Sequence, residues 1–424
     1  MRLRYLPLFL AMFGTASLSA ADFESCFSDS TLRIDYIFGG NAAKAEVMLD
    51  RMSKFPGWAG RRHHLNQLPY TGNGTVSVIL EATGDTIYRS SFSTLYQEWL
   101  STDEAQTSTM AFENSFLVPL PKNPVEIEVK LLDNRHQQIA KLNHKYDPKD
   151  ILVRQLTGEV LPHRYLHRGI ASNPIDVAIL AEGYRVEEMD SFYHYAQVAV
   201  DEILSYEPFK SNSAKFNFVA VASPSVDSGV SIPRLNEWKS TAFSSHFSTF
   251  YSDRYLTTRN VYDIHDALKG IPYEHIIILA NTPEYGGGGI YNSYMLTSSI
   301  HKSFKPVVVH EFGHSFAGLG DEYFYESDAL DGTYSLEVEP WEPNITTLID
   351  FGSKWEKMLQ KNTPIPTPVE QSKKYPVGVY EGGGYRTKGI YRPADECRMR
   401  NNTYPVFCPV CHEAIARVIN FYTD

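Results

Sequence analysis

HEFGHSFAGLGDEYF, at residues 310–324, carries two histidines four positions apart, His310 and His314. On a helix, residues at this spacing lie on one face, so both rings can reach a single metal ion. Zinc accepts neutral imidazole nitrogen, and a catalytic zinc keeps one coordination position open for water. Glu311 follows the first histidine, which places its carboxylate beside that water as a candidate general base. The alternative interpretation is a pair of hydrogen-bonded core histidines without a metal.

The flanking residues predict a helix that ends just before two acids. Pro306 suits the first turn of a helix, and the valines at 307–309 would bury the helix ahead of the histidines. The Gly-Leu-Gly sequence at 318–320 can end the helix and turn the chain back. Asp321 and Glu322 follow at once, and either carboxylate can supply the third ligand of a zinc site.

The same run resembles the active-site signature of the IgA metallo-endopeptidase family, peptidase family M64, which is grouped with the metzincin-like zinc peptidases. Metzincins combine a long zinc motif with a methionine turn below the metal. The run Cys397-Arg-Met-Arg400 is similar to that turn and makes Met399 its methionine. The resemblance therefore implies a zinc ion as cofactor and a peptidase that acts on a protein or glycoprotein.

This chain departs from the common metzincin spacing in two places. A glycine follows His314 by four residues rather than three, and position 320 is Gly rather than a metal-binding His. The third ligand therefore moves to the acids that follow. The resemblance favours Asp321, which lies nearest the expected place, and leaves Glu322 as the alternative.

Length and composition describe an ordinary globular protein. The chain has 424 residues, of which 43% are hydrophobic and 21% charged, enough for two or three domains with their own cores. The formal net charge is −11, which argues against a nucleic-acid partner because phosphates would be repelled.

Residues 1–21 have the features of a signal peptide. Two arginines precede a short apolar core, and Ala20-Ala21 supplies small residues for cleavage before Asp22. No later run reaches about 18 apolar residues, so we expect no integral membrane segment. The sequence thus predicts a secreted or periplasmic protein.

Residues 22–150 are expected to form an antiparallel β-sandwich. Alternating or apolar runs bounded by turn residues occur at 32–38, 75–82, 116–120 and 125–132. Strands at this spacing are typical of a sandwich. Residues 151–172 have few periodic apolar positions and are interpreted as a connector.

Residues 173–424 are expected to form the catalytic domain. Strands are predicted at 175–180, 216–222 and 275–280, and helices at 186–206, 260–268 and 409–422. A strand–helix–strand order implies a mixed or parallel sheet. The predicted fold class is therefore α+β multidomain, an N-terminal sandwich followed by a metzincin-like α/β zinc-peptidase domain.

A run of four glycines, residues 286–289, precedes an extended stretch. Because glycine permits close approach of another backbone, 290–296 is predicted to be an edge strand that binds an extended peptide. The candidate substrate-binding residues are Gly288, Gly289, Ile290, Tyr291 and Asn292. The alternative is a flexible linker without a substrate role.

Three of the four cysteines cluster near the C-terminus, at Cys397, Cys408 and Cys411. In an exported chain we expect a disulfide from Cys397 to Cys408 or Cys411, which would tie the methionine turn to the last helix. The alternative is a structural zinc held by the three thiolates and His412.

These observations predict a secreted zinc endopeptidase with Glu311 as general base. The alternative is a carbohydrate- or mucin-binding surface protein whose zinc site is structural or decayed. A zinc hydrolase acting on a non-peptide bond is a further possibility, which the expected edge strand disfavours because strand addition serves peptides.

Overall fold

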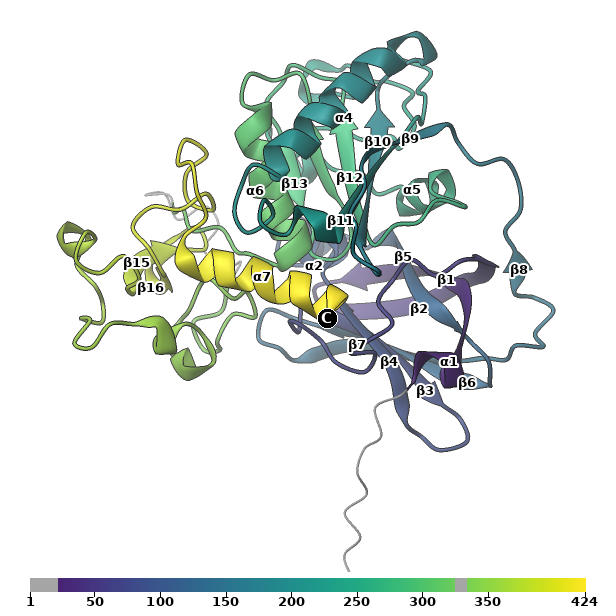
Figure 1. Ribbon diagram of the computed structural model, residues 1–424, viewed down its shortest axis with the longest axis horizontal. Helices are drawn as coiled ribbons and strands as arrows, with labels where there is room; N and C mark the ends of the chain where they lie inside the picture. Colours follow the sequence, from purple (N-terminus) through teal and green to yellow (C-terminus); the bar gives the residue numbers. More distant parts are fainter. Residues whose placement is uncertain (1–21, 325–333) are drawn as a thin grey trace, which may run out of the picture.

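The computed structural model describes residues 22–324 and 334–424, and the expected signal peptide at 1–21 lies outside the described residues. An N-terminal domain of strands lies beneath a second domain with a central sheet, and a largely irregular C-terminal segment lies beside them (Figure 1). The protein is an α+β multidomain fold. Within the described ranges, no helix is long and apolar enough to span a bilayer.

The N-terminal domain contains two four-stranded sheets, ordered β5-β1-β2-β8 and β4-β3-β6-β7. Their strands are β1 (Phe27–Asn41), β2 (Lys44–Pro56), β3 (Gly74–Leu80), β4 (Thr86–Phe92), β5 (Met110–Pro121), β6 (Val125–Leu132), β7 (Gln138–Tyr146) and β8 (Arg154–Gln155). Three short helices accompany them: α1 (Phe23–Cys26), α2 (Leu95–Trp99) and α3 (Glu104–Thr107). All of these pairings are antiparallel except that of β2 with β8.

The two N-terminal sheets share one core. Strand β6 buries every second residue, which gives it one apolar face. Aromatic rings from the two sheets meet between them: Phe92 of β4 lies 4.3 Å from Phe116 of β5 and 6.1 Å from Phe38 of β1, measured between ring centroids. The alternation visible in the sequence is therefore the pattern of a sheet with one buried face.

The second domain is built on a six-stranded sheet, ordered β13-β14-β12-β10-β11-β9. Its strands are β9 (His163–His167), β10 (Ile175–Glu182), β11 (Phe216–Val221), β12 (His275–Ala280), β13 (Gly287–Gly289) and β14 (Met295–Ser298). The four central strands are parallel, and β9 and β13 run antiparallel at the two edges. The helices are α4 (Met189–Ile203), α5 (Val261–Ala267) and α6 (Phe304–Ala317).

The expected connector at 151–172 is only partly a connector. It contains β8, which joins a sheet of the N-terminal domain, and β9, which pairs with β11 at the edge of the second sheet. Both strands are short and largely exposed or half-buried, so neither has an alternating pattern of its own. Their pairing depends on partners far away in the sequence.

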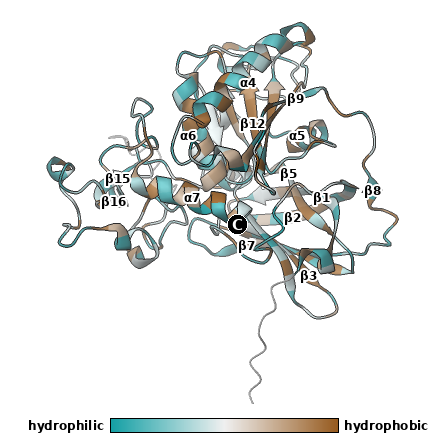
Figure 2. Cartoon of the chain, in the orientation of Figure 1, coloured by the Kyte–Doolittle hydropathy of each residue, from teal (hydrophilic) through white to brown (hydrophobic). Residues whose placement is uncertain are grey.

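The central sheet separates two hydrophobic cores. Along β10, Ile175, Val177 and Ile179 face the core formed with α4, α6 and the C-terminal helix α7 (Pro409–Thr423). Ala178 and Leu180 point the other way, into the core that continues into the N-terminal domain. The middle of the sheet is thus buried on both faces, and its strands β10 and β12 are strongly hydrophobic (Figure 2).

The rest of the C-terminal segment, over the residues that the structure describes, is mostly irregular. It contains the two-stranded sheet β15 (Tyr380–Gly383) and β16 (Arg386–Arg392). Seven short 3-10 helices occur in the described chain: η1 (Val186–Glu188), η2 (Ser213–Lys215), η3 (Pro233–Leu235), η4 (Thr249–Tyr251), η5 (Phe351–Ser353), η6 (Glu356–Met358) and η7 (Val369–Gln371). The chain then returns to the metal centre through residues 397–411.

Candidate metal centre

Helix α6 carries the predicted zinc motif in its last two turns. Its apolar residues are buried against the central sheet and α7, which holds the helix in place. Gly318 ends the helix in the left-handed conformation, with φ of 60°, a geometry that glycine adopts without strain. The turn brings the following acids back toward the histidines.

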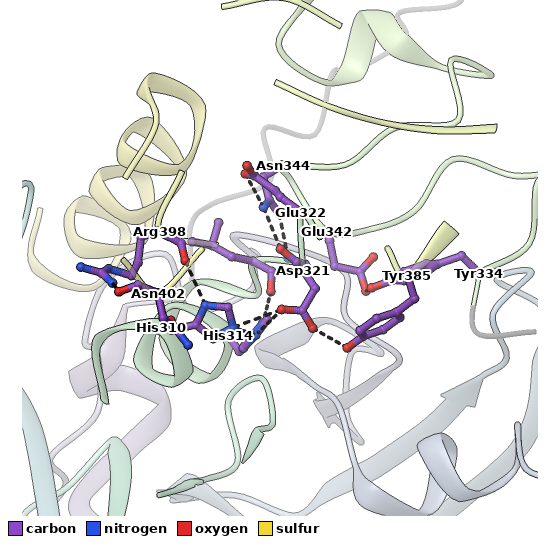
Figure 3. Close-up of polar contacts among 12 residues, drawn as sticks. His310, His314, Asp321, Glu322, Tyr334, Glu342, Asn344, Tyr385, Arg398 and Asn402 are labelled. Carbon is purple, nitrogen blue, oxygen red and sulfur yellow. Dashed lines mark hydrogen bonds and ion pairs between the residues drawn. The ribbon is translucent and has the colours of Figure 1, made fainter. Parts of the chain in front are cut away.

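Three predicted ligand atoms converge beside α6 (Figure 3). Nε2 of His310 lies 3.0 Å from Nε2 of His314 and 3.1 Å from Oδ1 of Asp321. The remaining side of the triangle, from His314 Nε2 to Asp321 Oδ1, is 3.2 Å. A point about 2 Å from all three atoms exists for such a triangle, and this is the bond length that zinc makes to nitrogen and carboxylate oxygen. The donor set therefore fits a zinc ion with further positions free.

Both histidine rings are held with Nε2 facing that point. Nδ1 of His310 donates to the carbonyl of Arg398 at 3.1 Å, and Nδ1 of His314 donates to the carbonyl of Leu319 at 2.5 Å. With the proton on Nδ1, the lone pair is on Nε2, as a metal ligand requires. These backbone acceptors select the tautomer that binds metal.

The electrostatics of the three ligands favour a cation. Burial raises the pKa of Asp321, but the two histidines outweigh burial and hold that pKa well below its usual range. Burial lowers the pKa of His314, but the Asp321 carboxylate and its hydrogen bond raise it to about 9. The negative charge that stabilises a protonated ring here would equally stabilise a divalent ion at the same point.

Glu311 lies between the motif and the edge of the sheet. Burial raises the pKa of its carboxyl, the direction expected of a group that accepts a proton near neutral pH. A Cβ atom added to Gly287 would lie 3.1 Å from its Oε1, so the carboxylate contacts strand β13. The general-base candidate therefore stands beside the metal ligands and against the edge strand.

The predicted edge strand at 290–296 is wrong in position. The edge strand is β13, Gly287–Gly289, and Ile290 and Tyr291 are buried in the turn that leads to β14. Asn292 donates to the carbonyl of Ser91, which binds this turn to the N-terminal domain. The apolar pattern of this stretch reflects burial in the core, not exposure on an edge.

Glycine explains how β13 lies so close to the metal helix. A Cβ atom at Gly289 would lie 2.4 Å from the Glu311 carbonyl oxygen and 2.9 Å from Cβ of His314. Only a glycine fits at such a distance. The glycine run is thus a contact surface for α6.

Met399 is fully buried beneath α6, and its Sδ would lie 3.0 Å from a Cβ atom added to Gly313. The glycine between the two histidines therefore gives the methionine its space. The carbonyl of Met399 accepts a hydrogen bond from the Glu322 backbone at 2.9 Å. This hydrogen bond joins the segment below α6 to the loop that carries Asp321, the candidate third ligand.

Glu322, the alternative third ligand, points away from the histidines. Its Oε1 accepts from Asn344 at 2.9 Å (Figure 3). The same oxygen lies 3.0 Å from Sγ of Cys411. Successive residues of an extended turn point in opposite directions, so Asp321 and Glu322 serve two different clusters.

The predicted disulfide is absent. All four cysteines are free, and Sγ of Cys397 lies 3.7 Å from Sγ of Cys411, against about 2.05 Å in a disulfide. The alternative prediction, a zinc held by the three thiolates and His412, also differs from the structure in its fourth residue. His412 is exposed, and Glu322 lies beside the three sulfurs instead. Three sulfurs and a carboxylate meet here; the sequence indicated the three sulfurs, but no sequence pattern pointed to Glu322 as the fourth group.

Two supporting groups were not predicted from the sequence. Tyr385, in the turn between β15 and β16, donates its hydroxyl to Oδ2 of Asp321 (Figure 3). Glu98 of α2 accepts a hydrogen bond from Tyr255 and interacts electrostatically with His314 and Glu311. Burial raises the pKa of Glu98 to about 7. Both groups come from segments distant in the sequence, and no local pattern marks them.

Comparison with known families agrees with this geometry. The family model described as IgA Peptidase M64 matches residues 165–376 and 370–419, and that described as Peptidase M64 N-terminus matches residues 22–143. A search of curated proteins gave no match. The catalytic match covers more than half of the chain and includes all three ligand candidates. The chain therefore belongs to the IgA peptidase M64 family, whose members are metallopeptidases that act on proteins.

Proposed function

We propose that the protein is an exported zinc-dependent endopeptidase, secreted or periplasmic, that hydrolyses peptide bonds in extracellular proteins. The proposal rests mainly on the geometry of His310, His314 and Asp321. Their ligand atoms surround one point at the distance of a zinc–ligand bond. The likeness of this arrangement, with Met399 below it, to the metzincins supports the assignment. Export is proposed from the character of residues 1–21.

When bound, zinc supplies Lewis acidity that activates water and polarises the scissile carbonyl. Glu311 then accepts the proton of the attacking water on its carboxylate and returns it to the leaving amine. Its raised pKa assists this exchange, because the carboxylate must both take up and release a proton. Asp321 contributes a negative charge to the ligand set, and Tyr385 orients its carboxylate.

We propose strand β13 as the site that aligns the substrate. Gly288 and Gly289 would pair with an extended peptide by strand addition, which would place a peptide bond near Glu311. Gly287, at the start of β13, already forms an isolated β-bridge with Tyr255, so the substrate would pair with the two glycines that follow. Ile290, Tyr291 and Asn292 would support the strand from the core and the N-terminal domain.

The proton-transfer role of Glu311 can be tested directly. Glu311→Ala should keep its zinc but lose about 10²- to 10⁴-fold in hydrolysis of a casein-like substrate, because the general base is removed. Zinc content and proteolysis are measured on the same preparations. Glu356→Ala, at an exposed glutamate of η6, is the control and should match the wild type. Unchanged activity in Glu311→Ala would refute the assignment.

The third ligand is tested by Asp321→Ala. This change should remove the catalytic zinc and abolish proteolysis, because two histidines alone hold zinc weakly. Retention of both would show that another residue completes the site.

A further inference from the structure

A second cluster of metal-binding side chains lies behind the catalytic centre. It consists of Glu322, Cys397, Cys408 and Cys411, and all four side chains are buried. Their candidate ligand atoms lie within 4.8 Å of one another. Three separate segments supply them: the loop after α6, the segment before Met399, and the start of α7.

The separations match a tetrahedral zinc site. Zinc–sulfur bonds of about 2.3 Å place neighbouring sulfurs about 3.8 Å apart, and a sulfur and a carboxylate oxygen about 3.5 Å apart. Sγ of Cys397 and Sγ of Cys411 are 3.7 Å apart. Oε1 of Glu322 is 3.0 Å from Sγ of Cys411 and 3.9 Å from Sγ of Cys408. The spacing is too wide for a disulfide and close to that of four ligands around one ion.

Backbone N–H groups and a helix N-terminus face the sulfurs, against the burial that raises the pKa of the Cys397 and Cys411 thiols. The backbone N–H of Cys408 donates to Sγ of Cys397 at 3.2 Å, and that of Cys411 donates to Sγ of Cys408 at 3.5 Å. Cys408 caps the N-terminus of α7, a helix of 15 residues whose dipole favours negative charge in its first turn. The buried Arg392 guanidinium adds a positive charge that interacts with Glu322.

The buried carboxylate of Glu322 also requires a partner. Asn344 holds its Oε1, but its Oε2 has no hydrogen-bond partner among the described residues. A carboxylate buried against three sulfurs is costly, and the guanidinium of Arg392 hydrogen-bonds Asp395 and two backbone carbonyls rather than this group. A metal ion would resolve this cost, and the Asn344 hydrogen bond is the kind of support that orients a ligand.

We propose that Glu322, Cys397, Cys408 and Cys411 bind a second zinc ion, and that this ion is structural. Four protein ligands fill a tetrahedral site and leave no position for water, and three thiolates select zinc over hard cations. The ion would join the loop bearing Asp321, the segment bearing Met399 and helix α7. It would thus hold the floor of the catalytic centre without taking part in the reaction.

Zinc stoichiometry tests this proposal on the mature chain, residues 22–424, independently of proteolysis. The wild type should contain two zinc ions per chain, and His310→Ala/His314→Ala should retain one. Adding Cys411→Ser to that double variant should remove the remaining zinc. Cys26→Ser, at a free cysteine outside the cluster, is the control and should retain two. No zinc in the folded double variant would overturn the proposal.

A second measurement applies even if Cys411→Ser does not fold. X-ray absorption at the zinc edge of the double variant should show three sulfur ligands and one oxygen, at about 2.3 and 2.0 Å. A shell of nitrogen and oxygen only would overturn the proposal. So would an intact mass, without reductant, that is lower by two hydrogens, because it would show a disulfide. Neither result depends on whether Glu311 is catalytic, so the two proposals fail separately.

Discussion

At the scale of single residues, the candidate metal centre depends on groups that orient its proposed ligands. Each ligand histidine donates its other ring proton to a backbone carbonyl, and Asp321 accepts from the Tyr385 hydroxyl. Groups of this kind hold a ligand in one orientation and therefore reduce the entropy lost when metal binds.

Tyr385→Phe should weaken the hold on the catalytic zinc about 10- to 100-fold, because Asp321 loses an orienting hydrogen bond. The measurement is the chelator concentration that halves proteolysis. Tyr375→Phe is the control, since its hydroxyl donates to the carbonyl of Asn362 at 3.4 Å and not to a candidate metal ligand. Equal chelator sensitivity in the two variants would contradict the role of Tyr385.

At the scale of elements, the candidate metal centre depends on the contact of strand β13 with helix α6. The strand is three glycines long and belongs to a mixed sheet whose central strands β10 and β12 are fully buried. Without side chains, it can lie against the backbone of the helix that carries the metal ligands. The same closeness brings the sheet edge to Glu311.

Gly289→Ala should displace β13 from α6, because its Cβ would lie 2.4 Å from the Glu311 carbonyl oxygen. We expect a loss of about 1–3 kcal/mol in the free energy of unfolding, and a larger fractional loss of proteolysis than of zinc. Gly352→Ala, where the nearest atom is 3.5 Å away, is the control. Chemical denaturation and zinc analysis report the two effects. A Gly289→Ala enzyme as stable and active as the control would contradict this contact.

At the scale of the whole molecule, the N-terminal domain forms part of the catalytic fold. Its core is continuous with one face of the central sheet. Arg33 of β1 is buried, bonds Asp35 at 2.7 Å, and reaches Asp266 of α5 at 2.5 Å. One buried guanidinium thus links the two domains.

Arg33→Leu should lower the free energy of unfolding by about 3 kcal/mol, because Asp35 stays buried with only Arg51 as a cationic partner. Asp266→Asn should cost about 1 kcal/mol or less, since that side chain is 57% exposed. Denaturant midpoints of the two variants give the comparison. Equal losses would show that the buried pair inside the N-terminal domain contributes little.

The same cluster predicts a response to acid. Burial raises the pKa of Asp35, but Arg33 and its hydrogen bonds outweigh burial and lower it. A carboxyl whose folded pKa is lowered stabilises the fold above its unfolded pKa of about 3.9, and this stability is lost as pH falls through the folded pKa. Wild-type stability should therefore fall below about pH 4 more steeply than that of Asp35→Asn. Parallel curves would contradict this assignment.

The sequence by itself determined the features that depend on local backbone geometry. His310 and His314 share a face because a helix repeats every 3.6 residues. The same helix geometry fixes the position of Glu311 beside that face. Strands β6 and β12 have the bounds predicted for them. The alternating residues of β6 are those of a strand buried on one face, and the continuous apolar run of β12 is that of a strand buried on both faces. No distant contact enters these inferences.

Tertiary structure alone decided the rest. Asp321 and Glu322 are adjacent acids with the same chemistry, and only packing against Asn344 and the cysteine cluster turns one toward the histidines and the other away. The position of the edge strand and the approach of Tyr385 likewise depend on segments far apart in the chain. Side-chain direction outside a regular element is set by such long-range contacts, and spacing along the sequence carries no record of them.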